Sequence, residues 1–220
     1  MPLRNVVYPV MALHDLLSYL RALDPKEVSR KCEVAYLPPK EEKGPRYLVN
    51  VLDLTYCFHL TDGTAEEVVK KEPADLSFSA VIAKYLANQI RCEPQKGWVG
   101  IERFANAQAY HSDYVRKVLR PMIEAFGTKA DLFTHSAIAT GGRREKLGGI
   151  SFSFKFFPRL LTLVQLWPSS DTVLGRAEVS VKFSPHAVQY LEGRDAMTMA
   201  EFLVKRLLHN RTTRRRSVST

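Results

Sequence analysis

Three closely spaced segments near the C-terminus constrain the fold of this chain more than any other feature. Residues 150–156 alternate apolar and polar side chains strictly, and residues 177–183 do the same. Residues 160–167 between them are almost continuously apolar. A side-chain period of two predicts β-strands, and connections of a few residues join strands that run antiparallel. The segments therefore predict an antiparallel meander of three strands.

Helical periodicity dominates the rest of the chain. Apolar residues recur every three or four positions over residues 10–23, 78–90 and 110–126. This spacing predicts amphipathic helices with one buried face. Pro121 lies inside the last of these segments, and it should kink or shorten that helix because proline has no backbone N–H to donate.

A hairpin and a final helix complete the predicted elements. Residues 46–60 change from the helical period to alternation, with aromatic and β-branched side chains, and they predict a hairpin. Thr198 and Glu201 have the spacing of a capping box, so we expect the last helix to begin there. The order of helices, hairpin, helices, meander and helix predicts an α+β fold. We expect a single domain in which an antiparallel sheet, made of the hairpin and the three-strand meander, is covered by amphipathic helices.

The positive charge of the chain is concentrated near its C-terminus. The 220 residues carry a formal net charge of +9, and residues 205–220 supply six of these charges because they contain six cations and no acid. We therefore expect a folded domain over residues 1–208 and an Arg-rich tail over residues 209–220 that is disordered when free. No signal-peptide pattern and no apolar run of about 20 residues occur, which predicts a cytoplasmic protein without a membrane span.

Cationic residues in two places are candidates for contact with an anion. The segment 141–149 holds cations between two glycine pairs, where backbone N–H groups can approach a phosphate. It follows a helix and precedes a strand, unlike a nucleotide-binding phosphate loop, so we favour a flexible connector with solvated charges. The candidate residues for contact with an anion, RNA or the ribosome are Arg143, Arg144, Lys146, Arg211, Arg214, Arg215 and Arg216.

The cysteine and histidine residues form no metal motif. Cys32, Cys57 and Cys92 are far apart without a C-x-x-C pair, so we expect no zinc and no iron–sulfur site within the chain. An odd number of cysteines fits a reducing compartment. Cys57 and His59 share one face of their predicted strand, which leaves a thiolate–imidazole dyad open as an alternative to ordinary packing. Such a dyad requires a cysteine with a lowered pKa.

Aromatic residues offer the candidate binding surface. Five of them could line an apolar groove between the meander and the helices: Trp98, Phe104, Tyr110, Tyr114 and Trp167. A planar ligand or a partner protein would suit such a groove, and packing in the core is the alternative role. No nucleophile or dinucleotide motif accompanies these residues, so no cofactor is identified.

Ordered fragments of the chain resemble a known family. They include Val-Ile-Ala-Lys-Tyr-Leu at residues 81–86, Gly-Trp-Val-Gly-Ile-Glu-Arg-Phe at residues 97–104 and Val-Lys-Phe-Ser at residues 181–184. Over residues 46–208 the chain is similar to an uncharacterised bacterial and archaeal family of the domain-of-unknown-function type. Some members carry this domain behind an iron–sulfur cluster domain. The resemblance implies a single domain and a neighbourhood of metal–cofactor chemistry, but no activity.

The chain departs from that family pattern in two places. Pro168 follows Trp167 where members have an acidic run, and Ile150 follows Gly149 where members have Asp. A ligand that those acids bind would be held poorly here. The three dispersed cysteines cannot supply the ligands of the iron–sulfur cluster domain, so we expect no such domain within these 220 residues.

These observations predict an accessory or binding module without catalytic activity, which recognises a partner protein or a planar cofactor. Two alternatives stay open. One is an RNA- or ribosome-associated factor that uses the C-terminal arginines, and the other is an enzyme built on Cys57 and His59.

Overall fold

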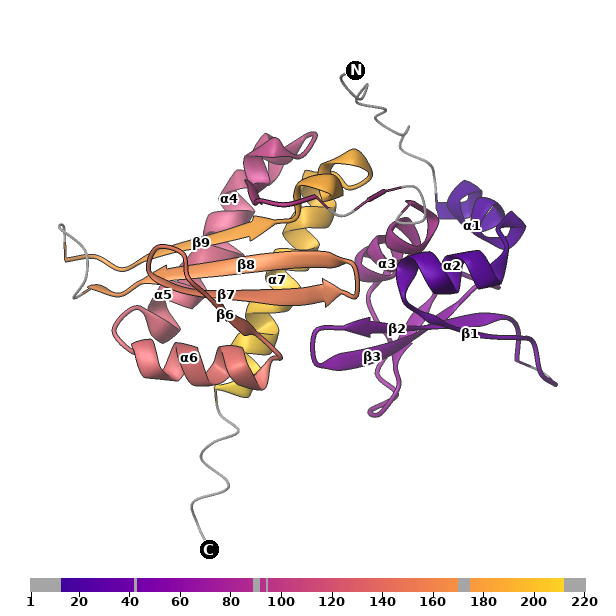
Figure 1. The fold of residues 1–220 in the computed structure, drawn as a ribbon, viewed down its shortest axis with the longest axis horizontal. Helices are drawn as coiled ribbons and strands as arrows, with labels where there is room; N and C mark the ends of the chain where they lie inside the picture. The colour runs from indigo at the N-terminus through magenta and orange to yellow at the C-terminus, as the bar shows by residue number, and fades with distance from the viewer. Residues whose placement is uncertain (1–12, 42, 89–91, 94, 170–174, 212–220) are drawn as a thin grey trace, which may run out of the picture.

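The computed structural model of the 220-residue chain describes residues 13–41, 43–88, 92–93, 95–169 and 175–211. Within these residues two antiparallel sheets lie next to each other, and helices pack against both of them (Figure 1). The fold is a single α+β domain, as the sequence predicts. We expected the hairpin and the meander in one sheet, but they belong to separate sheets. The short strands β1 and β4 flank the hairpin, and β5 and β6 flank the meander, so neither pairs with the other.

The N-terminal half of the chain forms a sheet with the strand order β1-β2-β3-β4. Alternate residues of β2, including Tyr47 and Val49, are fully buried, and the β2–β3 hairpin turns after Val51. The Asp24 carboxylate accepts the Lys26 N–H at 3.0 Å and caps the second helix. The elements are α1 (Leu13–Ala22), α2 (Pro25–Cys32), β1 (Ala35–Leu37), β2 (Arg46–Val51), β3 (Leu54–His59), β4 (Ala65–Glu67) and α3 (Leu76–Asn88).

The C-terminal half forms a sheet with the strand order β5-β9-β8-β7-β6, which contains the predicted meander as β7, β8 and β9. No helix in the described ranges has the length and apolar character that crossing a membrane requires. The strands and α-helices are β5 (Val99–Gly100), α4 (His111–Tyr114), α5 (Arg120–Phe126), α6 (Ala130–Ala139), β6 (Arg143–Glu145), β7 (Ile150–Phe157), β8 (Leu160–Trp167), β9 (Glu178–Phe183) and α7 (Gly193–Asn210). The described part of this half also contains the 3-10 segments η2 (Ile101–Arg103), η3 (Ala107–Tyr110) and η6 (Pro185–Gln189).

The helical segment that contains Pro121 is interrupted rather than ended. The π-helical turn η4 (Val115–Leu119) joins α4 to α5 immediately before the proline. Proline cannot donate the hydrogen bond that a regular helix requires, and its ring crowds the preceding turn. The widened turn accommodates this defect, since π-helical turns occur mostly as single insertions in longer helices.

The start of α7 differs from the sequence prediction. The helix begins at Gly193, about one turn before Thr198, because Glu192 and Asp195 form the capping box. The Asp195 carboxylate accepts the Glu192 N–H at 2.9 Å. Thr198 lies inside the helix and donates its hydroxyl to the Arg194 carbonyl at 3.0 Å. At the other end, α7 continues through Asn210, two residues into the segment that we expected to be a tail.

The segment between the glycine pairs also differs from the prediction of a flexible connector. Residues 143–145 form the edge strand β6, which pairs with residues 151–153 of β7. The Ser153 hydroxyl donates to the Glu145 carboxylate at 2.6 Å across this pairing. The glycines permit the tight turn between the strands, and Gly149 has a positive φ of 67°.

An aromatic cluster joins the two sheets. Phe78 of α3 stacks on Phe202 of α7 with ring centroids 4.3 Å apart. Tyr56 of β3 meets Phe78 edge-on at 5.2 Å, and Phe156 of β7 meets Phe202 edge-on at 5.9 Å. These are the ring arrangements that aromatic pairs favour. Since the four rings come from both sheets and from two helices, both halves of the chain share one hydrophobic core.

A polar junction lies beside this cluster. Arg206 of α7 contacts Asp53 in the β2–β3 turn through two guanidinium nitrogens, and its Nε donates at 3.1 Å. The Asn210 amide donates to the same carboxylate at 3.2 Å and to the Thr140 hydroxyl at 3.0 Å. Partial burial alone would raise the pKa of Asp53, but the hydrogen bonds from Arg206 and Asn210 hold that pKa below its usual value.

We expect the contribution of Asp53 to stability to disappear in acid. A carboxylate with a lowered folded-state pKa stabilises the fold above its unfolded pKa of about 3.9, and this stabilisation is lost as the pH falls through the folded pKa. Asp53→Asn should therefore lower the free energy of unfolding by about 1–2 kcal/mol at neutral pH, since the pair is partly exposed. Urea denaturation over a pH series should show the difference from the native chain shrinking below about pH 4.

Arg206→Met is the matched control for this experiment, because it removes the partner and keeps most of the side-chain volume. In the Arg206→Met chain, Asp53→Asn should cost less than in the native chain. If the free energies of unfolding of the native chain and of Asp53→Asn differ by the same amount at neutral pH and in strong acid, the lowered pKa of Asp53 is contradicted.

Candidate functional site

A cleft of about 490 Å³ opens between α3, α4 and α7. Its floor is apolar and includes Phe78 and Phe202, so the floor is the open side of the aromatic cluster. Met197 and Tyr110 extend this floor. Leu76, at the rim, is 75% exposed although it is a large aliphatic residue. A partner side chain could therefore bury apolar surface here.

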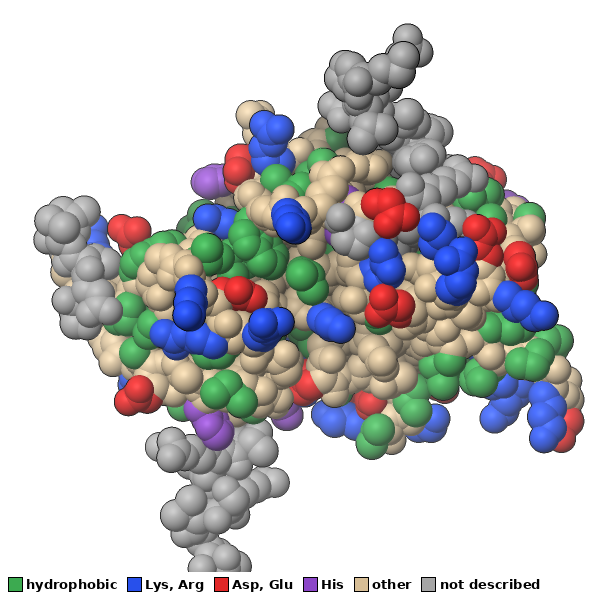
Figure 2. Space-filling view, viewed as in Figure 1, with side chains coloured by type: hydrophobic (Ala, Val, Ile, Leu, Met, Phe, Trp, Pro, Cys, Tyr) green, Lys and Arg blue, Asp and Glu red, His purple; other side chains and the backbone are tan. Residues whose placement is uncertain are grey.

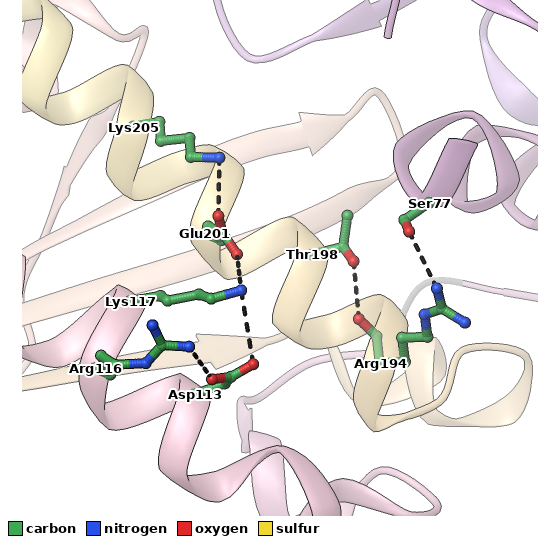
Figure 3. Close-up of polar contacts among 8 residues, drawn as sticks. All are labelled: Ser77, Asp113, Arg116, Lys117, Arg194, Thr198, Glu201 and Lys205. Carbon is green, nitrogen blue, oxygen red and sulfur yellow. Dashed lines mark hydrogen bonds and ion pairs between the residues drawn. The ribbon is translucent and has the colours of Figure 1, made fainter. Parts of the chain in front are cut away.

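Charged side chains of alternating sign form one wall of the cleft (Figure 3). The Lys205 ammonium lies 2.8 Å from a Glu201 oxygen. The Lys117 ammonium lies 3.6 Å from Glu201 and 3.6 Å from Asp113, so this lysine links α7 to the α4 side of the cleft. The Arg116 guanidinium pairs with the Asp113 carboxylate at the end of the row. Every acid in the row therefore has a cation beside it.

The opposite end of the cleft is closed by contacts at the start of α3. The Arg194 guanidinium donates to the Ser77 hydroxyl at 3.3 Å (Figure 3). The Asp75 carboxylate accepts the Phe78 N–H at 2.7 Å and caps α3. Three acidic and three basic residues line the cleft, so its formal charge is zero.

The electrostatics of the wall keep its carboxyl groups ionised. The hydrogen bond from Arg116, together with Lys117, lowers the pKa of Asp113. Burial alone would raise the pKa of Glu201, but Lys205 and Lys117 hold that pKa below its usual value. A general acid at neutral pH needs a raised pKa instead. These two carboxyls are therefore suited to pairing with cations and not to proton donation.

The five predicted aromatic residues lie in different places and do not form one groove. Tyr110 lines the cleft. Phe104 is buried edge-on against Phe183, and Tyr114 is buried with its hydroxyl 3.4 Å from the Val181 carbonyl. The remaining two are partly exposed: Trp98 lies beside β5, and Trp167 ends β8 next to the glycine turn at Gly149.

The structure describes four of the seven cationic residues that we predicted to contact an anion. Arg143, Arg144 and Lys146 are exposed in or beside β6. The Arg144 guanidinium lies 5.3 Å from the ring centroid of Phe152, where the aromatic face attracts a cation. Arg211 follows the end of α7. Arg214, Arg215 and Arg216 lie outside the described residues.

The surplus of positive charge assigned to the C-terminal segment is smaller than its sequence implies. Lys205 pairs with Glu201, and Arg206 pairs with Asp53. Both cations belong to α7: Lys205 is neutralised by Glu201 of the same helix, and Arg206 by Asp53 of the β2–β3 turn. Figure 2 shows lysine and arginine side chains interspersed with acidic ones on the face that it draws.

Cys57 and His59 lie on the same face of β3, as predicted, and Glu66 of β4 joins them. Burial raises the pKa of the Cys57 thiol, although Arg46 beside it acts in the opposite direction. A catalytic dyad requires the opposite shift, because only the thiolate is nucleophilic. The geometry therefore brings the pair together without activating the cysteine.

Sequence reasoning identified only Tyr110 among the cleft residues. The opposite charges at Asp113 and Lys117, and at Glu201 and Lys205, have the i, i+4 spacing that stabilises a helix surface. That spacing could have indicated two charged helix faces. Their meeting across the cleft depends on how α4 packs against α7, which the spacing does not encode.

The comparisons with known proteins identify a family. Residues 24–206 match the model described as Domain of unknown function (DUF3786), and the chain belongs to that family. No curated protein and no solved structure matches the chain.

We expect Cys57 to react slowly with iodoacetamide at neutral pH when EDTA is present. Burial raises the pKa of its thiol, so a smaller fraction is thiolate than in free cysteine. Mass spectrometry of the folded chain over a time course should show slower labelling of Cys57 than of the same peptide in the unfolded chain. Labelling faster than that of free cysteine would instead support the hypothesis that Cys57 and His59 form a catalytic dyad.

Proposed function

We propose that this member of the DUF3786 family is a non-catalytic accessory module that binds a segment of a partner protein in the cleft between α3, α4 and α7. One observation carries the proposal. The stacked pair Phe78 and Phe202 forms an apolar floor that stays open under a wall of balanced charges.

The floor supplies the affinity in this proposal. Leu76 is exposed at the rim, and the partly buried Phe202 lines the cavity together with the edge of the buried Phe78. An apolar side chain of Leu or Phe size that fills such a space gains about 1.5–3 kcal/mol from leaving water. The cleft accommodates one or two side chains of this size, which fits recognition of a short segment.

The wall favours a protein segment over a polyanion or a planar cofactor. The residues that line the cleft have a formal charge of zero, so the cleft has no excess of cations to attract nucleic acid. The aromatic residues that a planar cofactor would need are dispersed over the fold. A peptide can instead pair its own polar groups with the side chains of Lys117, Glu201 and Arg194 around an apolar anchor.

The same wall supports a binding role over acid–base catalysis. Asp113 and Glu201 both lie against Lys117, and their lowered pKa values keep them charged at neutral pH. A pair of carboxyls that performs acid–base chemistry has pKa values driven apart by its surroundings.

Selection from a displayed library of random peptides tests this function. Peptides enriched on the native chain should carry a large apolar residue, and Leu76→Asp should weaken their binding at least about tenfold, because it places a charge at the rim of the floor. Fluorescence anisotropy with labelled peptides measures the affinities.

Ile138→Asp is the matched control, since Ile138 is an aliphatic residue on α6 that is 62% exposed and does not line the cleft. It should leave the affinities unchanged. A library that yields no binders, or binders that tolerate Leu76→Asp as well as Ile138→Asp, would overturn the proposed function.

A further inference from the structure

Cys57, His59 and Glu66 form a side-chain cluster on the outer face of the four-stranded sheet. Cys57 pairs directly with Glu66 across β3 and β4, and His59 follows two positions later on the same face. A donor atom from each, the thiol sulfur, a ring nitrogen and a carboxylate oxygen, lies within 4.8 Å of the other two. Tyr56 and Phe58 on the opposite face are buried in the core, so the cluster faces away from α3 and from the cleft.

The three groups are a ligand set for zinc. Zinc binds cysteine sulfur, histidine nitrogen and carboxylate oxygen, and sites with three protein ligands leave a fourth position for water. Tetrahedral bonds to these atoms place the donors about 3.3–3.6 Å apart. Cys57 is nearly fixed at 7% exposure, while His59 and Glu66 are only partly buried and can rotate to close the remaining distance.

We propose that Cys57, His59 and Glu66 bind a Zn²⁺ ion whose fourth ligand is water. On binding, the Cys57 thiol loses its proton to solvent, and its sulfur donates an electron pair to the metal. The His59 ring and the Glu66 carboxylate donate the other two pairs. The two negative ligands neutralise the charge of the ion, so the filled site places no excess charge on the sheet.

The hairpin holds the ligands in place before metal arrives. The His59 N–H donates to the Thr64 carbonyl at 2.8 Å, and the Gly63 N–H donates to the His59 carbonyl at 2.9 Å. Gly63 has the positive φ of 76° that this turn needs. Within the described part of the chain, no hydrogen bond of the Cys57 thiol or of the His59 ring must break when metal enters. The backbone that carries His59 is therefore already ordered before metal binds, and only side-chain rotation of His59 and Glu66 remains to be fixed.

Nearby cations limit the affinity without blocking the site. The Lys71 ammonium lies 3.9 Å from a Glu66 oxygen, but Lys71 is exposed and Glu66 is only partly buried, so water weakens the pair. Lys71 can turn into solvent when a divalent ion takes its place. Arg46 pairs with His59 across β2 and β3, so a second cation lies next to the cluster.

Cobalt substitution tests the site. The full chain is freed of metal with EDTA, desalted and titrated with Co²⁺, which reports on its ligands by absorption. We expect one equivalent of Co²⁺ to produce a thiolate-to-cobalt charge-transfer band together with the visible bands of a four-coordinate ion. One equivalent of Zn²⁺ should remove both signals, because zinc binds the same ligands more tightly than cobalt does.

Variants identify the ligands. Cys57→Ser should abolish the charge-transfer band, and His59→Gln or Glu66→Gln should weaken Co²⁺ binding at least about tenfold. Cys92→Ser is the matched control and should retain the full signal, because Cys92 lies outside the cluster. No band in the native chain, a band that survives Cys57→Ser, or affinities that His59→Gln and Glu66→Gln leave unchanged would each overturn the proposal. Since the cluster and the cleft lie on different faces, the outcome of the cobalt titration does not depend on the outcome of the peptide selection.

Discussion

The stacking of Phe78 on Phe202 is the contact on which the rest of the fold depends. Each sheet alone would expose one face of apolar residues, and both cover that face with helices that meet at this pair. Tyr56 and Phe156 bring one strand from each sheet against it. Truncation of a buried ring of this kind costs about 3–5 kcal/mol, a large part of the stability of a domain.

The same contact explains the positions of the cleft and of the cluster of Cys57, His59 and Glu66. The cleft is the open side of the stacked pair, so its floor is part of the core and its position is fixed by the core. The cluster of Cys57, His59 and Glu66 lies on the other face of the four-stranded sheet, because a strand turns alternate residues to opposite faces. Tyr56 and Phe58 therefore point into the core, while Cys57 points to the opposite face, where His59 and Glu66 are only partly buried.

Local sequence patterns predicted the elements that depend on local physics. Alternation in residues 150–156 and 177–183 predicted the meander correctly. The start of α7 was missed because Glu192 and Asp195 form a capping box without the usual Ser or Thr. The division into two sheets, the aromatic cluster and the cleft were not predictable, since each depends on pairing between residues far apart in the chain. Glu66 was missed for the same reason, although the face shared by Cys57 and His59 was evident.

Native-state hydrogen exchange measures most directly whether the aromatic cluster makes the two sheets one cooperative unit. The slowest amides of the β2–β3 hairpin and of the β7–β8 pair should exchange with the same opening free energy and the same dependence on denaturant. Phe156→Ala should lower both opening free energies by the same amount, although Phe156 belongs to only one of the sheets. Hairpin amides that open at a lower free energy, and that do not respond to Phe156→Ala, would show two independent units and contradict this account.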